Sequence, residues 1–208
     1  MMKSTVLKTI AFSLCFGLSG CAFWQDGPQS TSATSSTASS TTVVQNAIVD
    51  ASPYALTRSL ALYQQLFVEM QTADTKTETA TFEAYLLADG RRIKLNLTHT
   101  NVPVWQITYD GQTIHEERQS AVPAELNARY LLSDIALAYW PEKFLVRQLS
   151  PLTLRSEQNK RLIFDAEGNV LTDIAYSNGA SPENPQGTIT LTNHALRYRI
   201  IINSHSVY

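Results

Sequence analysis

The sequence contains very little cysteine. Its 208 residues include two, Cys15 and Cys21. Cys15 lies inside an apolar leader that we expect to be removed, and Cys21 follows that leader directly. Apart from Cys21, the remaining chain then has no thiol for a disulfide, a metal site or a catalytic nucleophile.

An excess of positive charge is also missing. The chain has 16 Lys and Arg residues against 18 Asp and Glu residues. Loss of Lys3 and Lys8 with the leader leaves 14 basic and 18 acidic residues, a net charge of minus 4. This balance argues against nucleic acid as a partner, because surfaces that bind nucleic acid are basic.

The common motifs of catalytic and metal sites are absent too. The four histidines, His99, His115, His194 and His205, are scattered, and none has a second histidine or a carboxylate at a metal-ligand spacing. The chain has no Gly-x-Ser-x-Gly, no His-Glu-x-x-His and no glycine-rich phosphate loop. We therefore predict that the protein is not an enzyme and holds no metal and no cofactor. A catalytic triad assembled from distant residues stays open as an alternative.

The apolar run near the N-terminus, Ile10–Leu18, is too short to span a bilayer. Two lysines precede it, so we assign residues 1–20 to a secretory signal peptide. The run ends in Leu18-Ser-Gly-Cys21, which resembles the lipobox of bacterial lipoproteins. The resemblance implies that Cys21 is acylated and becomes the first mature residue. A small-residue cleavage site followed by an accidental cysteine is the alternative.

The residues after the cysteine favour a tethered outer-membrane lipoprotein. Ala22 resembles the outer-membrane sorting choice of such lipoproteins, with the domain facing the periplasm. Acyl chains on Cys21 would hold the protein to the membrane. Ser, Thr and Ala then dominate, with QSTSATSSTASSTT at residues 29–42. This composition cannot form a core, so we assign residues 21–50 to a flexible tether and residues 51–208 to one folded domain.

The folded part is a series of short segments in which apolar and polar residues alternate. In one of them Ile93, Leu95 and Leu97 face one way and the intervening polar residues face the other. About ten segments are typical of strands: the later half of 60–70, then 79–87, 91–98, 104–109, 113–118, 152–157, 161–165, 169–176, 188–192 and 196–203. Short links favour antiparallel pairing. We expect a mainly β domain with inserted helices (α+β), a curved antiparallel half-barrel closed by a helical lid.

The helical insertion is the stretch Val122–Leu149, with a break at Trp140-Pro141 and a shorter helix over Glu142–Gln148. Its long helix is apolar on two faces, which requires two partners. We expect the face with Leu131, Leu132, Ile135 and Tyr139 to pack on the sheet and the other face to line a ligand cavity. The candidate ligand-binding residues are Leu126, Tyr130, Leu137 and Trp140 on that second face, with Trp105 and Tyr109 on a strand. Ordinary core packing is the alternative for all of these except Leu126.

Asp134 is a carboxylate in the middle of this apolar helix. Buried carboxylates are normally paired, so an ion pair with Arg129, Arg155 or another arginine is the favoured interpretation. Binding of a ligand's polar head is the alternative.

Strands, helix and strands in this order resemble the LolA/LolB-like fold, a half-open antiparallel barrel closed by helices that carries acyl chains in the bacterial envelope. A closer resemblance is to an uncharacterised family of small envelope lipoproteins whose genes lie in clusters that make aryl polyenes, fatty-acid-like pigments. It rests on the segments Tyr130–Asp134, Trp140-Pro141, Arg161–Phe164 and Leu196–Ile200. The stretch Thr98–Val102 offers no counterpart of the exposed loop leucine of LolB, which disfavours a general lipoprotein receptor.

The sequence is consistent with three functions. The first is binding of an apolar or acyl-chain ligand, such as an aryl polyene lipid, for transport or insertion into the outer membrane. The second is a non-catalytic accessory of an envelope complex, with a protein partner that the sequence does not name. The third is a hydrolase or transferase acting on lipid. A carrier needs an apolar pocket of several hundred Å³, on the order of a typical ligand site, whereas an accessory can fill its barrel with side chains.

Overall fold

The computed structural model describes residues 47–71, 74–120, 122 and 126–207, which belong to one compact unit, Thr42–Tyr208. A short 3-10 turn, Pro53–Ala55, precedes the first strand. The strands are β1 (Leu60–Gln71), β2 (Thr77–Ala88), β3 (Ile93–His99), β4 (Val102–Tyr109), β5 (Ile114–Arg118), β6 (Thr153–Glu157), β7 (Lys160–Phe164), β8 (Val170–Ser177), β9 (Gly187–Asn193) and β10 (Tyr198–Ser206). The helices α1 (Ala128–Tyr139) and α2 (Glu142–Leu149) lie between β5 and β6.

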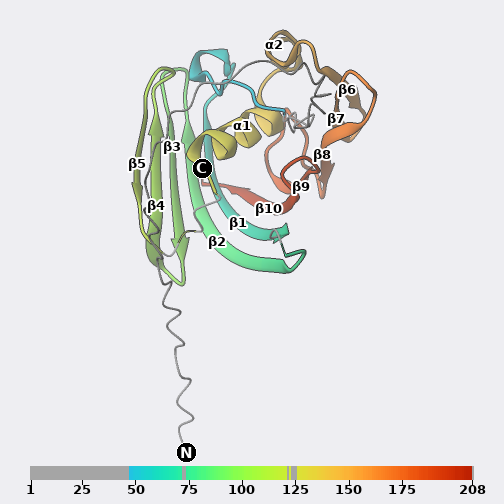
Figure 1. The fold of residues 1–208 in the computed structure, drawn as a ribbon. Helices are drawn as coiled ribbons and strands as arrows, with labels where there is room; N and C mark the ends of the chain where they lie inside the picture. The colour runs from blue at the N-terminus through green and yellow to red at the C-terminus, as the bar shows by residue number, and fades with distance from the viewer. Residues whose placement is uncertain (1–46, 72–73, 121, 123–125, 208) are drawn as a thin grey trace, which may run out of the picture. The chain divides into compact units, whose positions relative to one another are not determined.

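All ten strands form one antiparallel sheet in the order β5-β4-β3-β2-β1-β10-β9-β8-β7-β6. The chain starts in the middle of the sheet, moves outward to β5, crosses through the two helices to β6 and returns to the middle (Figure 1). This confirms the predicted mainly β fold with one helical insertion. The first segment is a strand over its whole length rather than in its later half, because Leu60 to Gln71 pairs continuously with β2.

The sheet curves around α1, which lies on its concave side (Figure 1). Period-two alternation places one apolar set of each central strand on this side. In β3 the predicted inward residues Ile93, Leu95 and Leu97 are buried, and in β9 the same holds for Ile189 and Leu191. Sheet and helix thus share one hydrophobic core.

Local chemistry sets the limits of α1. Asn127 caps the start, its side-chain oxygen accepting a hydrogen bond from the Arg129 amide at 2.8 Å. At the other end Trp140 has extended backbone, because Pro141 disfavours the helical conformation of the residue before it. The predicted break between the two helices is therefore confirmed. The first part of the predicted helical stretch, residues 123–125, lies outside the described residues.

Buried polar side chains hold the C-terminal end of α1. Arg161 on β7, 3% exposed, donates to the carbonyls of Leu137 at 2.7 Å and Trp140 at 2.9 Å. The Tyr176 hydroxyl on β8 donates to the Ala138 carbonyl at 2.8 Å. These bonds satisfy helix carbonyls that have no partner within the helix, and the guanidinium charge also opposes the negative end of the helix dipole.

The segment before β1 covers α1 from its other side. Ala47, Val49 and Ala51 are buried, and the Val49 amide donates to the Ser133 hydroxyl at 2.9 Å. Trp140 Nε1 donates to the Ser52 carbonyl at 2.8 Å. Packing therefore begins upstream of residue 51, where we placed the start of the domain. The predicted signal peptide, Cys21 and most of the tether lie outside the described residues.

Candidate apolar ligand pocket

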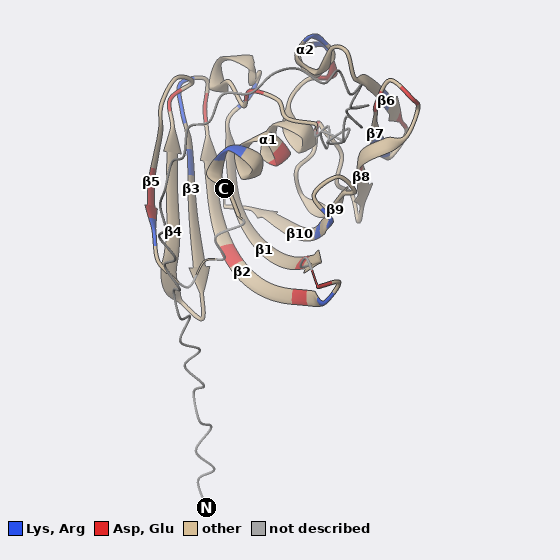
Figure 2. Ribbon diagram, in the orientation of Figure 1, with Lys and Arg blue, Asp and Glu red and all other residues tan. Residues whose placement is uncertain are grey.

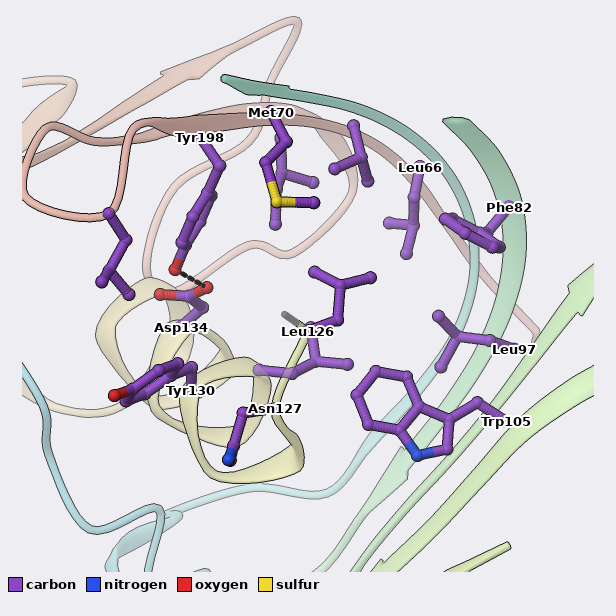
Figure 3. A pocket seen from close by; sticks show the side chains of 14 residues that line it. Leu66, Met70, Phe82, Leu97, Trp105, Leu126, Asn127, Tyr130, Asp134 and Tyr198 are labelled. Atoms are coloured by element: carbon purple, nitrogen blue, oxygen red, sulfur yellow. Dashed lines mark hydrogen bonds between the residues drawn. The ribbon is translucent and has the colours of Figure 1, made fainter. Parts of the chain in front are cut away.

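A cavity of about 150 Å³ lies between the N-terminal half of α1 and the concave face of the sheet (Figure 3). Its wall is almost wholly apolar. The lining residues come from β1, β2, β3, β4, β10, the turn between β9 and β10, α1 and the two residues before α1: Leu66, Val68, Met70, Phe82, Leu97, Trp105, Leu126, Asn127, Tyr130, Leu131, Asp134, Leu196, Tyr198 and Ile200.

Trp105 forms one wall of this pocket, and two side chains of β5 hold its indole ring in place. Its indole Nε1 donates to Glu116 Oε2 at 3.0 Å, and the Arg118 guanidinium stacks 4.9 Å from the ring centroid. Arg118 also donates to the Leu126 carbonyl at 2.8 Å. The edge strand β5 therefore fixes both the tryptophan wall and the chain segment that enters α1.

The pocket reaches the surface beside the start of α1. Its floor residues, such as Leu66, Phe82 and Leu97, are buried, whereas Met70 and Leu126 are partly exposed. In Figure 3 Met70 lies at the top and Leu126 near the centre, with Phe82, Leu97 and Trp105 to their right. The described wall thus combines partly exposed side chains such as Met70 and Leu126 with buried aromatic and aliphatic ones.

A second, smaller cavity of about 30 Å³ continues further along α1. The two cavities share Leu66, Leu131, Asp134 and Ile200 in their walls. The two cavities therefore lie next to each other, and these four side chains contact both.

Asp134 is the acidic residue in the middle of α1 (Figure 2). It is buried, and its Oδ2 accepts a hydrogen bond from the Tyr198 hydroxyl at 2.6 Å. Burial raises the pKa of Asp134 to about 7, and the Tyr198 hydrogen bond opposes that shift. The same burial, followed by the nearby Asp134 carboxylate, raises the pKa of Tyr198.

The predicted ion pair of Asp134 with an arginine is therefore wrong. Arg129 is exposed and lines a different hollow beside Tyr109, while Arg155 is exposed and stacks 5.1 Å from the Phe164 ring centroid. Within the part of the chain that the structure describes, no arginine or lysine pairs with Asp134. A neutral tyrosine is its partner instead, so no cation offsets the effect of burial, which raises the pKa of Asp134.

The six candidate ligand-binding residues separate into two groups. Trp105, Leu126 and Tyr130 line the pocket. Tyr109 lies elsewhere and donates a hydrogen bond to Asp50, while Leu137 and Trp140 are fully buried in the core.

The separation has a physical reason. We expected the short helix α2 to be too small to cover the second face of α1, but the segment Ala47–Ser52 and strands β7 and β8 cover it. The face of α1 that lines the pocket contains Tyr130, Leu131 and Asp134, and Leu126 lines the pocket just before the helix begins. Leu137 is not part of this face. Tyr139 does face the sheet as predicted, through hydrogen bonds that involve Gln64 on β1 and Ser204 on β10.

Several lining residues were not candidates at the sequence level. Leu66, Phe82 and Leu97 belong to three neighbouring strands, and Tyr198 comes from the end of the chain. Alternation marks each of them as inward facing, but only the register between strands shows which inward residues face a gap rather than a neighbour.

The size of the pocket limits what it holds in this conformation. The cavity volume is about 150 Å³. An apolar cavity of roughly that volume accommodates a benzene-sized group.

Among the described residues, no cluster of three His, Cys, Asp or Glu side chains could hold a metal ion. In the same residues, no helix combines the length and apolarity that a membrane crossing requires.

Residues 61–206 match the family described as "Protein of unknown function (DUF3261)". The chain belongs to this family. The match includes every pocket residue from Leu66 to Ile200, so the DUF3261 region is the half-barrel itself. No curated protein matches the chain in sequence.

Two solved structures resemble the DUF3261 domain distantly. One is a LolA superfamily protein from Nitrosomonas europaea, with a TM-score of 0.39 and 10% identity over 77% of this chain and 90% of that one. The other is a DUF1329 family protein from Desulfovibrio piger, with a TM-score of 0.38 and 9% identity over 77% of this chain and 92% of that one. The fold described above rests on the strand order of this chain.

Proposed function

We propose that the protein binds an apolar or acyl-chain ligand in the pocket beneath α1, for transport or insertion into the outer membrane. The single observation that carries this proposal is the pocket wall, in which twelve of the fourteen lining side chains, all but Asn127 and Asp134, are hydrophobic or aromatic. Such a wall contributes roughly 25 cal/mol for each Å² of apolar ligand surface that it removes from water.

The proposal includes a location. A signal peptide over residues 1–20 and acylation of Cys21 would hold the half-barrel at the outer membrane, facing the periplasm. The domain would then act where apolar molecules are delivered or inserted. An aryl polyene lipid is the candidate ligand that the family resemblance suggests.

A second candidate function is a non-catalytic accessory of an envelope complex. The observation that favours it is the cavity volume of about 150 Å³, since a site for a whole lipid occupies several hundred Å³. Under the first proposal, the side chains that contact both cavities move when the ligand enters, and this movement increases the cavity volume. Under the second, the pocket stays closed.

An apolar dye distinguishes the two. Leu131 lies in the wall of both cavities, so Leu131→Trp would fill the space where they meet. We expect N-phenyl-1-naphthylamine to fluoresce strongly with the unit 42–208 and at least about tenfold less with Leu131→Trp. Val146→Trp places the same side chain at an exposed position of α2 and serves as the control. Equal fluorescence of all three proteins would mean that the dye binds outside the pocket.

A further inference from the structure

The polar groups of the pocket are gathered on one side. Asp134 from α1 and Tyr198 from β10 lie together, while Phe82, Leu97 and Trp105 form the opposite side (Figure 3). The pocket is therefore not uniformly apolar. Asn127 also lines it, but this residue is exposed and its side chain caps α1. The buried hydrogen-bonding position at Asp134 lies across from an apolar wall, an arrangement that suits an amphiphilic ligand.

The carboxylate of Asp134 has capacity to spare. Tyr198 is its hydrogen-bond partner within the described chain, and it binds Oδ2. An ionised carboxylate can accept about four hydrogen bonds through two oxygens. A buried polar atom gains most from a partner when water is excluded, so a donor on a ligand would be favoured at this position.

The charge around Asp134 decides which ligands fit. The titratable side chains that line the two cavities are Asp134 itself, Tyr130 and Tyr139 of α1, and Tyr198 of β10. No lysine, arginine or histidine is among these described lining residues. An anionic group would therefore meet a carboxylate without any compensating cation, which costs free energy in a site of low polarity.

Resting on the proposed function, we infer that Asp134 and Tyr198 bind the polar end of the ligand, and that this end is an uncharged hydrogen-bond donor such as a hydroxyl group. A free carboxylate or phosphate is excluded from the same position. The raised pKa of Asp134 agrees with this, because burial that disfavours the ionised form of Asp134 also disfavours an anionic group on a ligand.

Three probes that share one ring test the inference at pH 8: toluene, benzyl alcohol and benzoate. Their ring matches the benzene-sized cavity. Calorimetric titration of the unit 42–208 should show toluene and benzyl alcohol binding and benzoate binding at least about tenfold more weakly. Asp134→Leu removes the acceptor, so it should weaken benzyl alcohol binding about tenfold, as loss of a buried hydrogen bond of ~1.4 kcal/mol does, and change toluene binding less than threefold.

Asp134→Asn provides the second variant, because it keeps the shape of the side chain and a hydrogen bond with Tyr198 while removing the charge. It should retain benzyl alcohol binding and strengthen benzoate binding about tenfold. Equal weakening of toluene and benzyl alcohol by Asp134→Leu, or equal binding of benzoate and benzyl alcohol by the unaltered protein, overturns the inference while leaving the proposed function intact. Failure of every probe to bind, toluene included, overturns both.

Discussion

The Tyr198 hydroxyl, near the C-terminal end of the chain, donates a 2.6 Å hydrogen bond to Asp134 in the middle of α1. The bond joins the helix to the central strand pair at the wall of the pocket, across 64 residues of sequence. It gives a buried carboxylate a neutral partner rather than a cation. We therefore expect the stability of the domain to depend on the protonation of Asp134.

The first prediction concerns the pH dependence of stability. The pKa of Asp134 is raised from 3.8 to about 7 by burial, so the folded state holds its proton more tightly than the unfolded state does. The stabilisation is full below pH 3.8 and is lost as the pH rises through about 7, on the order of 4 kcal/mol at most. Asp134→Asn should flatten this decline in urea unfolding between pH 4 and pH 8. Parallel pH profiles for the two proteins would show that Asp134 titrates normally.

The second prediction concerns Arg161, which binds two carbonyls at the end of α1. Arg161→Met keeps the aliphatic stem but leaves both carbonyls buried without this donor. We expect the free energy of unfolding to fall by roughly 2 to 4 kcal/mol in urea titration. Arg155→Met, at an exposed position, is the control and should change stability by less than about 0.5 kcal/mol. If the two variants unfold at the same urea concentration, Arg161 does not hold the helix end.

The third prediction compares the stability contributions of a core residue, Leu137, and a pocket residue, Leu126. Leu137 is fully buried, whereas Leu126 lies partly exposed at the pocket rim. Leu137→Ala should cost roughly 2 to 5 kcal/mol of stability, as emptying a core site does. Leu126→Ala should cost less than half as much, because its side chain already contacts water. Thermal or urea unfolding measures both, and a larger loss for Leu126 would mean that the two roles are exchanged.

The fourth prediction concerns the membrane anchor. Cys21→Ser removes the only thiol that the expected mature chain offers for acylation. The variant should lose its acyl chains and leave the outer-membrane fraction for the soluble or unprocessed one. Fractionation and mass measurement check this outcome. Recovery of the variant in the outer-membrane fraction, in the same amount as the parent, would refute acylation as the anchor.

Much of the fold could be predicted from the sequence because it follows from local patterns. Alternation identified the ten strands, and Pro141 identified the break between the helices. The two apolar faces of α1 correctly required two partners. The second partner was missed because Ala47 and Val49 lie in a short segment without periodicity, next to the Ser/Thr-rich stretch. Nothing local distinguishes such a segment from a loop.

The site could be predicted only in part because it depends on contacts between distant segments. Trp105, Leu126 and Tyr130 were expected to line a cavity and do so. Leu137 was assigned to the same face by helical geometry, yet Arg161 and the strands beyond it enclose that part of the helix. The partner of Asp134 was expected to be an arginine on charge grounds. The partner is Tyr198 instead, because the pairing of β10 with β1 in the middle of the sheet brings the Tyr198 hydroxyl within hydrogen-bond distance of Asp134.

Native mass spectrometry tests the central claim most directly, because it detects a bound molecule without choosing a probe. The unit 42–208 would be produced in the bacterial periplasm and purified without detergent, with Leu131→Trp and Val146→Trp prepared in parallel. We predict an added mass that organic solvent extracts from the parent and from Val146→Trp, and that is absent from Leu131→Trp. The bare protein mass in all three samples, or the same added mass in all three, would contradict a ligand in the pocket beneath α1.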